Sequence, residues 1–97
     1  MFRLDGKNAL ITGASGGIGG EIAKALHASG ACVALSGTRV EPLQALADEL
    51  GSRAYVLPCN LSDAEAVTAL PKQAADVMGS VDILVNNAGV TRDNLFM

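Results

Sequence analysis

Short apolar runs alternate along the chain with longer segments in which apolar residues recur every three or four positions. An uninterrupted apolar run of four or five residues is typical of a buried strand in a parallel sheet, whereas the longer period is typical of an amphipathic helix. The pattern therefore predicts four strands with a helix between each strand and the next. The predicted strands are residues 8–12, 32–36, 54–57 and 81–85.

The first two predicted helices each end at a glycine, a residue that favours helix C-termini. The first follows a glycine-rich turn, ends at Gly30, and is expected to bury Ile18, Ile22, Ala25 and Leu26. The second begins near Thr38, because Thr38 and Glu41 have the spacing of a capping box, and ends at Gly51. Its expected apolar stripe is Val40, Leu43, Leu46, Ala47 and Leu50.

The third predicted helix contains a proline. Ser62 and Glu65 again have capping-box spacing, and the helix is expected to reach about Met78 before Gly79 closes it. Pro71 lies inside this segment. It either removes one hydrogen bond and kinks the helix, or starts a second helical piece.

Strands that alternate with helices predict an α/β fold with a parallel sheet. The expected strand order is 3-2-1-4, which is the N-terminal half of a doubly wound (Rossmann) sheet. Only eight residues follow Gly89, so no segment is expected to cover or pair with the outer side of the fourth strand. Residues 1–97 are thus expected to be a partial domain, cut off before its second half.

Composition and charge exclude several classes of partner. The net charge is −3 and the basic residues are not clustered, so neither nucleic acid nor an anionic membrane surface is an expected partner. No apolar run approaches the ~20 residues of a membrane span. Cys32 and Cys59 lack metal-ligand spacing, so no metal site is expected, and both are predicted to be reduced and buried, as in a cytoplasmic protein.

The glycine-rich turn after the first strand is the strongest candidate for chemistry. Gly13 suits a tight strand-to-helix turn, Gly17 lets a diphosphate approach the helix N-terminus, and Gly19 lets the helix lie close to the sheet. Ser15 offers a hydroxyl to a phosphate. The turn therefore predicts dinucleotide binding, and the alternative is a tight turn without a ligand.

The end of the second strand distinguishes between the two nicotinamide cofactors. A dinucleotide-binding domain selective for NAD carries an acidic residue there, which bonds the ribose 2′-hydroxyl. This chain has Gly37, Thr38 and Arg39 instead. An arginine pairs well with a 2′-phosphate, so NADP is predicted. The alternative is that Arg39 is a solvated residue in the first turn of the second helix.

Two motifs give the chain its resemblance to a known family. Residues 12–19 match the TGxxxGIG motif of short-chain dehydrogenases/reductases, and residues 86–89 match the NNAG motif of the same family, about 70 residues later. The chain resembles this family over its whole length. Within the family, residues 35–39 and 89–97 are most similar to bacterial 3-oxoacyl-[acyl-carrier-protein] reductases.

The resemblance implies roles for the matching positions. Ile18 belongs to the glycine motif, and Asn60 and Leu61 lie where the family holds the adenine ring. For Asn60, the alternative is a turn residue that caps the third helix. Asn86, Ala88 and Gly89 are expected to line the floor beneath the adenosine ribose and the nicotinamide, with Asn86 bonded to Thr12. Gly16 stands where many NADP-dependent relatives have arginine, which leaves Arg39 as the main determinant of cofactor preference.

The resemblance also implies an activity that this chain lacks the residues to perform alone. The family transfers a hydride to a carbonyl, using a serine, a tyrosine, a lysine four residues after it, and usually an asparagine, all beyond the NNAG motif. Tyr55 is the one tyrosine of the chain and is followed at the fourth position by Cys59, so no catalytic residue is assigned.

Several functions remain open at this stage. The parent is expected to reduce a 3-oxoacyl group on acyl carrier protein, with NADPH as cofactor, and to form a tetramer. The alternatives are another carbonyl or alcohol substrate, or a non-catalytic NADP-binding module.

Overall fold

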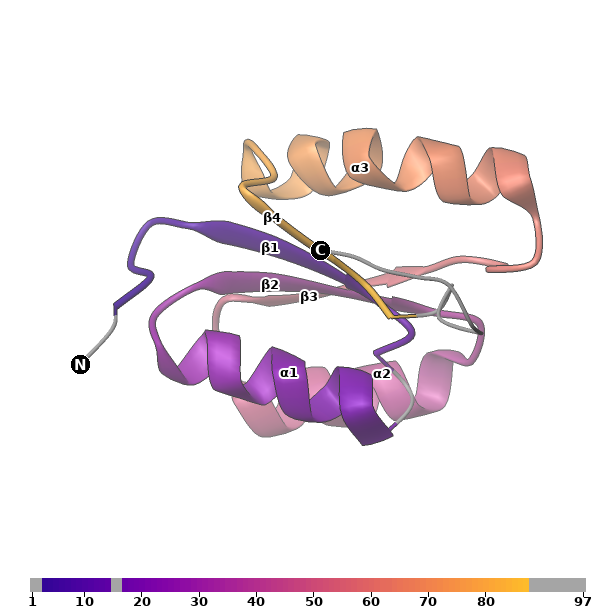
Figure 1. The fold of residues 1–97 in the computed structure, drawn as a ribbon. Helices are drawn as coiled ribbons and strands as arrows, with labels where there is room; N and C mark the ends of the chain where they lie inside the picture. Colours follow the sequence, from indigo (N-terminus) through magenta and orange to yellow (C-terminus); the bar gives the residue numbers. More distant parts are fainter. Residues whose placement is uncertain (1–2, 15–16, 88–97) are drawn as a thin grey trace.

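The sheet has the predicted parallel topology. In the computed structural model, which describes residues 3–14 and 17–87, four strands lie in the order β3-β2-β1-β4. The strands are β1 (Asn8–Thr12), β2 (Cys32–Gly37), β3 (Ala54–Pro58) and β4 (Ile83–Asn86). All neighbouring pairs are parallel. The predicted strand order is confirmed, and the carboxyl ends of all four strands meet at one edge of the sheet (Figure 1).

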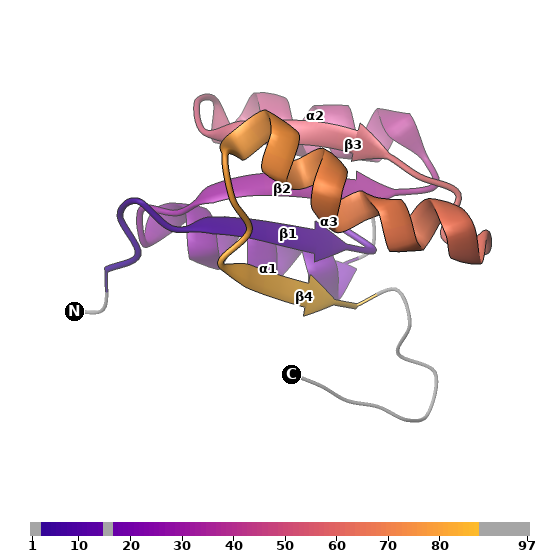
Figure 2. The ribbon, with the colours of Figure 1, turned by 90° about the horizontal axis from the view of Figure 1, so that it is seen from above.

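Three helices cover the two faces of this sheet. Helices α1 (Gly17–Ala28) and α2 (Val40–Leu50) lie side by side on one face, and α3 (Ala64–Met78) crosses the other (Figure 1). Seen from above, β4 forms one edge of the sheet beside β1, and β3 forms the other edge (Figure 2). The described part of the chain is therefore a three-layered unit with two free strand edges.

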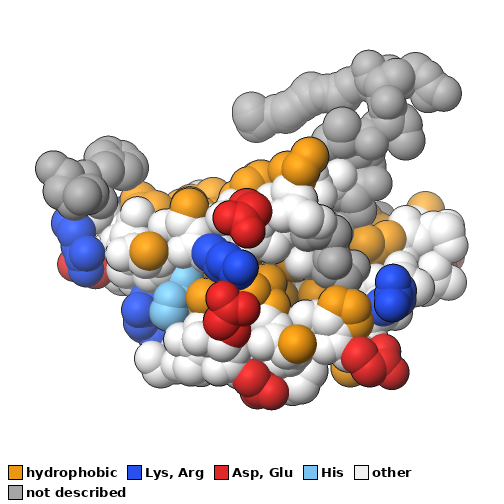
Figure 3. All heavy atoms as spheres, turned by 90° about the horizontal axis from the view of Figure 1, so that it is seen from below, with side chains coloured by type: hydrophobic (Ala, Val, Ile, Leu, Met, Phe, Trp, Pro, Cys, Tyr) orange, Lys and Arg blue, Asp and Glu red, His pale blue; other side chains and the backbone are white. Residues whose placement is uncertain are grey.

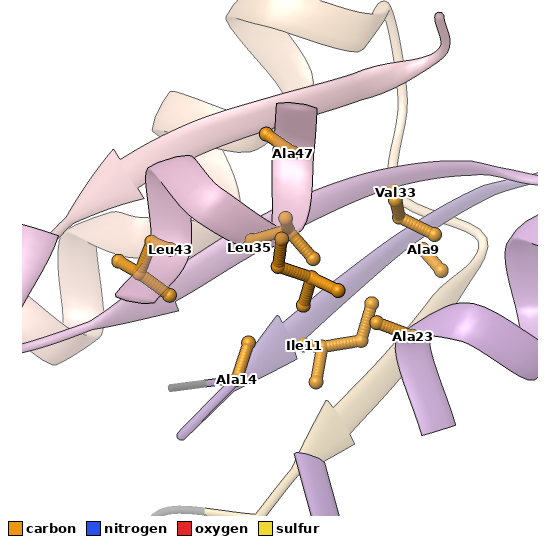
Figure 4. Packing of buried hydrophobic residues seen from close by; sticks show 9 residues of the cluster. Ala9, Ile11, Ala14, Ala23, Val33, Leu35, Leu43 and Ala47 are labelled. Carbon is orange, nitrogen blue, oxygen red and sulfur yellow. The ribbon is translucent and has the colours of Figure 1, made fainter. Parts of the chain in front are cut away.

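Alternation along the two central strands gives each face its own core. Ile11 and Leu35 point toward α1 and α2, where they pack with Leu43 and Ala23 (Figure 4). Leu10 and Ala34 point the other way, toward Leu70 and Ala74 of α3. Because β1 and β2 are buried on both faces, their sequences read as continuous apolar runs rather than as alternating ones.

The outer surface of α1 and α2 carries interspersed acidic, basic and apolar side chains (Figure 3). The Lys24 ammonium lies 3.4 Å from a Glu49 carboxylate oxygen and 3.6 Å from a Glu21 oxygen, which joins the two helices. These carboxylates raise the pKa of Lys24 above its ordinary value. Since all three side chains are largely exposed, the ion pairs contribute little to stability.

The N-terminus of α2 differs from the prediction. Thr38 and Glu41 form no capping box, because the helix begins at Val40 with Arg39 as its N-cap residue. A helix capped by Thr38 would need the nitrogen of Pro42 to donate to the Thr38 carbonyl, and proline has no N–H. The later start places Pro42 in the first turn, where the missing donor is harmless.

Helix α3 is also capped differently from the prediction. Asp63, rather than Ser62, is the N-cap residue, and its carboxylate accepts bonds from the backbone N–H groups of Glu65 (3.0 Å) and Ala66 (3.3 Å). The Ser62 hydroxyl donates to the Asn60 side chain instead, at 2.6 Å. A single helix runs through Pro71, which excludes the alternative that Pro71 starts a second helix.

Smaller corrections concern burial and strand length. Ile18 is 70% exposed and Ala25 is also exposed, so α1 packs through Gly19, Ala23 and the predicted Leu26, and not through the full predicted stripe. The fourth strand begins two residues later than predicted, at Ile83. Cys32 and Cys59 are free thiols, as predicted, but each is half-buried rather than buried.

Candidate functional site

The candidate site lies along the carboxyl edge of the sheet. Thr12 is in register with Ser36 on one side and with Asn86 on the other, and Gly37 is in register with Pro58. The turns that follow these positions therefore emerge side by side. The strand ends and the segments that follow them carry nine of the predicted cofactor-binding residues: Gly13, Gly17, Ile18, Gly19, Thr38, Arg39, Asn60, Leu61 and Asn86. The other three, Ser15, Ala88 and Gly89, lie outside the described residues.

The glycine turn is anchored to the neighbouring strand. Gly13 has φ +68°, a backbone conformation that favours glycine. The next residue, Ala14, is buried, and its N–H donates to the Ser36 carbonyl at 3.0 Å. The backbone thereby turns from the end of β1 toward α1, which begins at Gly17.

Gly17 and Gly19 differ in what surrounds them. A Cβ at Gly19 would collide with the Gly13 carbonyl oxygen, and would lie 2.9 Å from the Gly13 carbonyl carbon and 3.0 Å from Ala14 Cα. A Cβ at Gly17 would meet nothing within 4 Å. Helix packing therefore explains the glycine at 19 but leaves the glycine at 17 unexplained. A small residue at 17 fits an anion held against the first backbone N–H groups of α1.

The segment after β2 presents a cation beside a second helix N-terminus. Thr38 and Arg39 are exposed, and the Arg39 side chain does not cap α2. Among residues 3–14 and 17–87, ion pairs involve Arg3 and Lys24 but not Arg39. Arg39 thus adds a cationic side chain at the N-terminus of α2, where the positive end of the helix dipole also favours an anion.

The turn after β3 already uses part of its polar capacity. Asn60 Oδ1 accepts from the Ser62 N–H (3.1 Å) and hydroxyl (2.6 Å), so Asn60 is a turn residue, although Asp63 is the cap of α3. A bond from Asn60 to an adenine ring would therefore come from its amide Nδ2 group. Leu61 packs on the core beneath α3. Burial, and secondarily the Asp63 carboxylate, raise the pKa of the neighbouring Cys59 thiol.

The end of β4 is tied to β1 and to the glycine turn. The Thr12 hydroxyl lies 3.1 Å from Asn86 Oδ1 and 3.3 Å from the Val85 carbonyl, which confirms the predicted Thr12–Asn86 bond. The Asn87 amide donates to the Gly13 carbonyl at 3.4 Å. Asn87 was not predicted as a site residue, although its place in the asparagine doublet was a signal. The two asparagines fix the spacing between β4 and the turn.

Ser36 is a second site residue that the sequence pattern does not predict. It is fully buried beside Thr12, its register partner on β1, and its hydroxyl has no hydrogen-bond partner. It is the one such buried side-chain atom among the described residues. Nothing in the apolar run of β2 distinguished this serine from a neutral core residue.

The residues present fit a dinucleotide. Along the carboxyl edge, in the spatial order β3-β2-β1-β4, lie an amide group at Asn60, a cation at Arg39, the N-terminus of α1 with its open approach at Gly17, and an amide group at Asn86. The described residues contain no group of three or more side chains that could hold a metal ion. Within the same residues, no helix has the length and apolarity to cross a membrane.

Comparisons with known proteins agree with this arrangement. The family model described as short chain dehydrogenase matches residues 7–97. The chain is 58% identical over 97 residues to nodulation protein G of Rhizobium sp. (strain N33), covering all of this chain and 40% of that protein. It is 46% identical over 96 residues to the 3-oxoacyl-[acyl-carrier-protein] reductase FabG of Escherichia coli (strain K12), covering 99% of this chain and 39% of that protein.

A solved structure shows the same similarity in three dimensions. The crystal structure of 3-ketoacyl-(acyl-carrier-protein) reductase from Brucella melitensis, complexed with NADH, superimposes with a TM-score of 0.78 at 36% identity. The superposition covers 84% of this chain and 33% of that chain. The chain thus spans about 40% of the length of the curated relatives it matches.

Proposed function

Because the chain belongs to the short-chain dehydrogenase family of oxidoreductases, we propose that it is the NADP-binding part of a 3-oxoacyl-[acyl-carrier-protein] reductase. The full-length parent would use NADPH to reduce a 3-oxoacyl thioester to the 3-hydroxyacyl form during fatty acid synthesis. Its partner would be acyl carrier protein, and it would act in the cytoplasm as a homotetramer. Similarity to FabG proteins over nearly the whole chain supports the choice of substrate.

The observation that carries the proposal is the contrast between Gly17 and Gly19. The glycine at 19 is required by the collision with Gly13, whereas no atom of residues 3–14 and 18–87 restricts a side chain at 17. Gly17 is the first residue of α1, where unpaired N–H groups and the helix dipole favour a diphosphate. A residue without a side chain at this point lets the diphosphate reach the backbone.

The preference for NADP over NAD rests on the corner formed by Thr38 and Arg39. A 2′-phosphate would meet the Arg39 guanidinium and the N-terminus of α2, whereas a carboxylate that could bond a 2′-hydroxyl is missing from residues 36–39. The Brucella melitensis reductase is complexed with NADH. A direct comparison of both cofactors is therefore part of the test.

Bound NADPH would supply a hydride to the carbonyl carbon of the substrate. The residues of this chain would hold the diphosphate at the glycine turn, the 2′-phosphate at Arg39, and the adenine beside Asn60. Asn86 and the segment after it would support the nicotinamide end. Since no catalytic residue is assigned within residues 1–97, these residues alone are expected to bind NADP without turning over an acetoacetyl thioester.

Two alternatives remain within the same family. The parent could act on another carbonyl or alcohol, or the chain could be a non-catalytic NADP-binding module. NADPH oxidation by the full-length parent, measured with acetoacetyl thioester and with a steroid ketone, distinguishes the substrates. Binding of NADP without turnover of any carbonyl by that parent would support the module.

The central experiment is titration calorimetry with NADP⁺ and NAD⁺. Gly17→Ala is expected to weaken the binding of both nucleotides by at least about tenfold while leaving thermal stability unchanged, since its Cβ meets no protein atom. Arg39→Asp is expected to remove the preference for NADP⁺ and to improve the relative binding of NAD⁺. Gly20→Ala is the matched control, because Gly20 lies in the same helix and is outside the predicted contacts.

The outcomes separate the parts of the proposal. Wild-type protein that binds neither nucleotide would contradict dinucleotide binding by this chain. Full affinity in Gly17→Ala would remove the role of the glycine turn. An unchanged ratio of NADP⁺ to NAD⁺ affinity in Arg39→Asp would remove Arg39 as the determinant of cofactor preference.

A further inference from the structure

Ser36 holds a buried hydroxyl with no partner at the centre of the candidate site. Ser36 is fully buried, and it lies in register between Thr12 of β1 and Leu57 of β3. A buried hydroxyl without a hydrogen bond destabilises the folded state, and an alanine would avoid that loss. An orphaned polar group in a native core therefore calls for an explanation.

The backbone carbonyls of Ser36 and Gly37 connect the end of β2 to the glycine turn and to the segment after β3. Its carbonyl accepts the bond from Ala14 N–H of the glycine turn. The carbonyl of the next residue, Gly37, accepts from Cys59 N–H at 2.9 Å, immediately before Asn60. The glycine turn is thus joined directly to Ser36, and an adjustment of Ala14 on diphosphate binding would reach Ser36 through this hydrogen bond.

The neighbouring polar group on β1 behaves differently. Thr12 is also buried, but its hydroxyl is bonded to Asn86. Of these two neighbouring hydroxyls, that of Thr12 joins β1 to β4, whereas that of Ser36 makes no hydrogen bond. A purely structural explanation accounts for Thr12 and leaves Ser36 without a role.

We propose that Ser36 is a positioning residue whose hydroxyl gains its hydrogen-bond partner when a dinucleotide binds at the carboxyl edge. The inference rests on the proposed function, since it needs a nucleotide at the glycine turn. In this state the hydroxyl couples the turn to the segment that carries Thr38 and Arg39. The hydroxyl lowers the stability of the free protein while it is unpaired, and its new hydrogen bond in the complex strengthens nucleotide binding.

The test is Ser36→Ala, followed by thermal unfolding and by titration calorimetry with NADP⁺ and NAD⁺. We expect the melting temperature of the free protein to rise by about 4–8 °C, the range for a loss of one such penalty in a domain of this size. We expect the affinity for both nucleotides to fall by about tenfold, with the ratio between them unchanged. Thr68→Ala is the control, because it removes an exposed hydroxyl that bonds to Ala64 within α3, and its affinities should match the wild type.

The outcomes distinguish this inference from the proposed function. If the wild type binds neither nucleotide, the proposed function fails and takes the inference with it. If the wild type binds and Ser36→Ala binds equally well, the inference alone is overturned. It is also overturned if Ser36→Ala is no more stable than the wild type, or if it loses affinity for NADP⁺ but not for NAD⁺, which would assign it to the 2′-phosphate.

Discussion

The two ends of the same sheet are built in opposite ways. At the amino edge, where the strands begin, side chains bond to backbone groups of neighbouring elements and close the structure. At the carboxyl edge, polar groups are exposed, unpaired, or used to space the turns. The same four strands supply both edges, so the difference comes from the side chains at their ends.

The amino edge is closed by a cluster around Asn8. The Asn8 amide donates to the Met78 carbonyl at 3.2 Å and to the Ser80 hydroxyl at 3.1 Å. Asp82 accepts from the backbone N–H of Asn8 at 2.9 Å, and its own N–H donates to the Asn8 carbonyl at 2.8 Å. Asp82 thus bonds to Asn8 through both its carboxylate and its backbone N–H. It fixes the turn between α3 and β4 to the start of β1.

A second group of hydrogen bonds at the amino edge involves Arg53. This residue has φ +60°, which is unfavourable for a side chain with a Cβ. Its guanidinium donates to the Ala31 carbonyl at 2.7 Å, and its own carbonyl accepts from Val33 N–H. His27 lies 2.7 Å from the Ser52 carbonyl nearby. These bonds hold the strained turn before β3 against the end of α1.

The carboxyl edge has fewer side-chain hydrogen bonds of this kind between elements. Arg39 is exposed and outside the described ion pairs, the Ser36 hydroxyl has no partner, and Gly17 faces open space. Groups without partners in the free protein are available to a ligand. The contrast supports the proposed function, in which the amino edge stabilises the fold and the carboxyl edge binds the nucleotide.

The largest expected effect on stability comes from a substitution at the carboxyl edge, at the glycine that packs against the turn. Gly19→Ala should lower the free energy of unfolding by about 3 kcal/mol or more, because its Cβ would overlap the backbone of the glycine turn. Urea denaturation measures the loss. Gly20→Ala is the control and should stabilise the protein by about 0.5–1 kcal/mol, since its Cβ meets only ordinary contacts, at 3.5 Å from the Ala14 carbonyl oxygen and 3.9 Å from Leu46. Equal stabilities for the two variants would show that α1 does not pack closely against the turn.

A smaller effect is expected at the amino edge. Asp82→Ala removes the acceptor of the Asn8 N–H and should lower the free energy of unfolding by about 1–2 kcal/mol. The affinity of the folded protein for NADP⁺ should stay within twofold of the wild type, because the cluster lies at the opposite edge from the glycine turn. Calorimetry at a temperature well below the unfolding transition measures this affinity. A large loss of affinity would show that the two edges are not independent.

The smallest effect uses the two cysteines as reporters of the two edges. Cys59 follows β3 at the carboxyl edge, and Cys32 begins β2 at the amino edge. Because burial raises the pKa of the Cys59 thiol, less thiolate is present at pH 7–8. In Cys32→Ser, Cys59 should therefore react with iodoacetamide roughly threefold or more slowly than in urea, and its rate should rise at higher pH than that of an unfolded thiol.

Nucleotide protection completes this measurement. Saturating NADP⁺ should slow the alkylation of Cys59 further, because Cys59 precedes Asn60 at the proposed adenine side of the site. In Cys59→Ser, the rate at Cys32 should be unaffected by NADP⁺. Protection of both thiols would indicate general stabilisation instead of local contact.

The positions of the site residues were more predictable than the polar contacts around them. The glycine motif and the asparagine doublet each begin at the carboxyl end of a strand, and parallel strands bring such positions to one edge. The capping residues were harder, because Thr38, Ser62 and Asp63 are all competent caps in sequence. The choice depended on Pro42, which delays α2, and on Asn60, which engages Ser62.

The sequence by itself determined the order of the elements, the parallel sheet and the edge at which a nucleotide would bind, because these follow from local periodicity and from the chirality of strand–helix–strand units. Tertiary structure decided which groups were left without partners. The isolation of the Ser36 hydroxyl, the closure around Asn8 and Asp82, and the difference between Gly17 and Gly19 all depend on residues distant in sequence. Such contacts leave no periodic signal, since each is set by the packing of whole elements against one another.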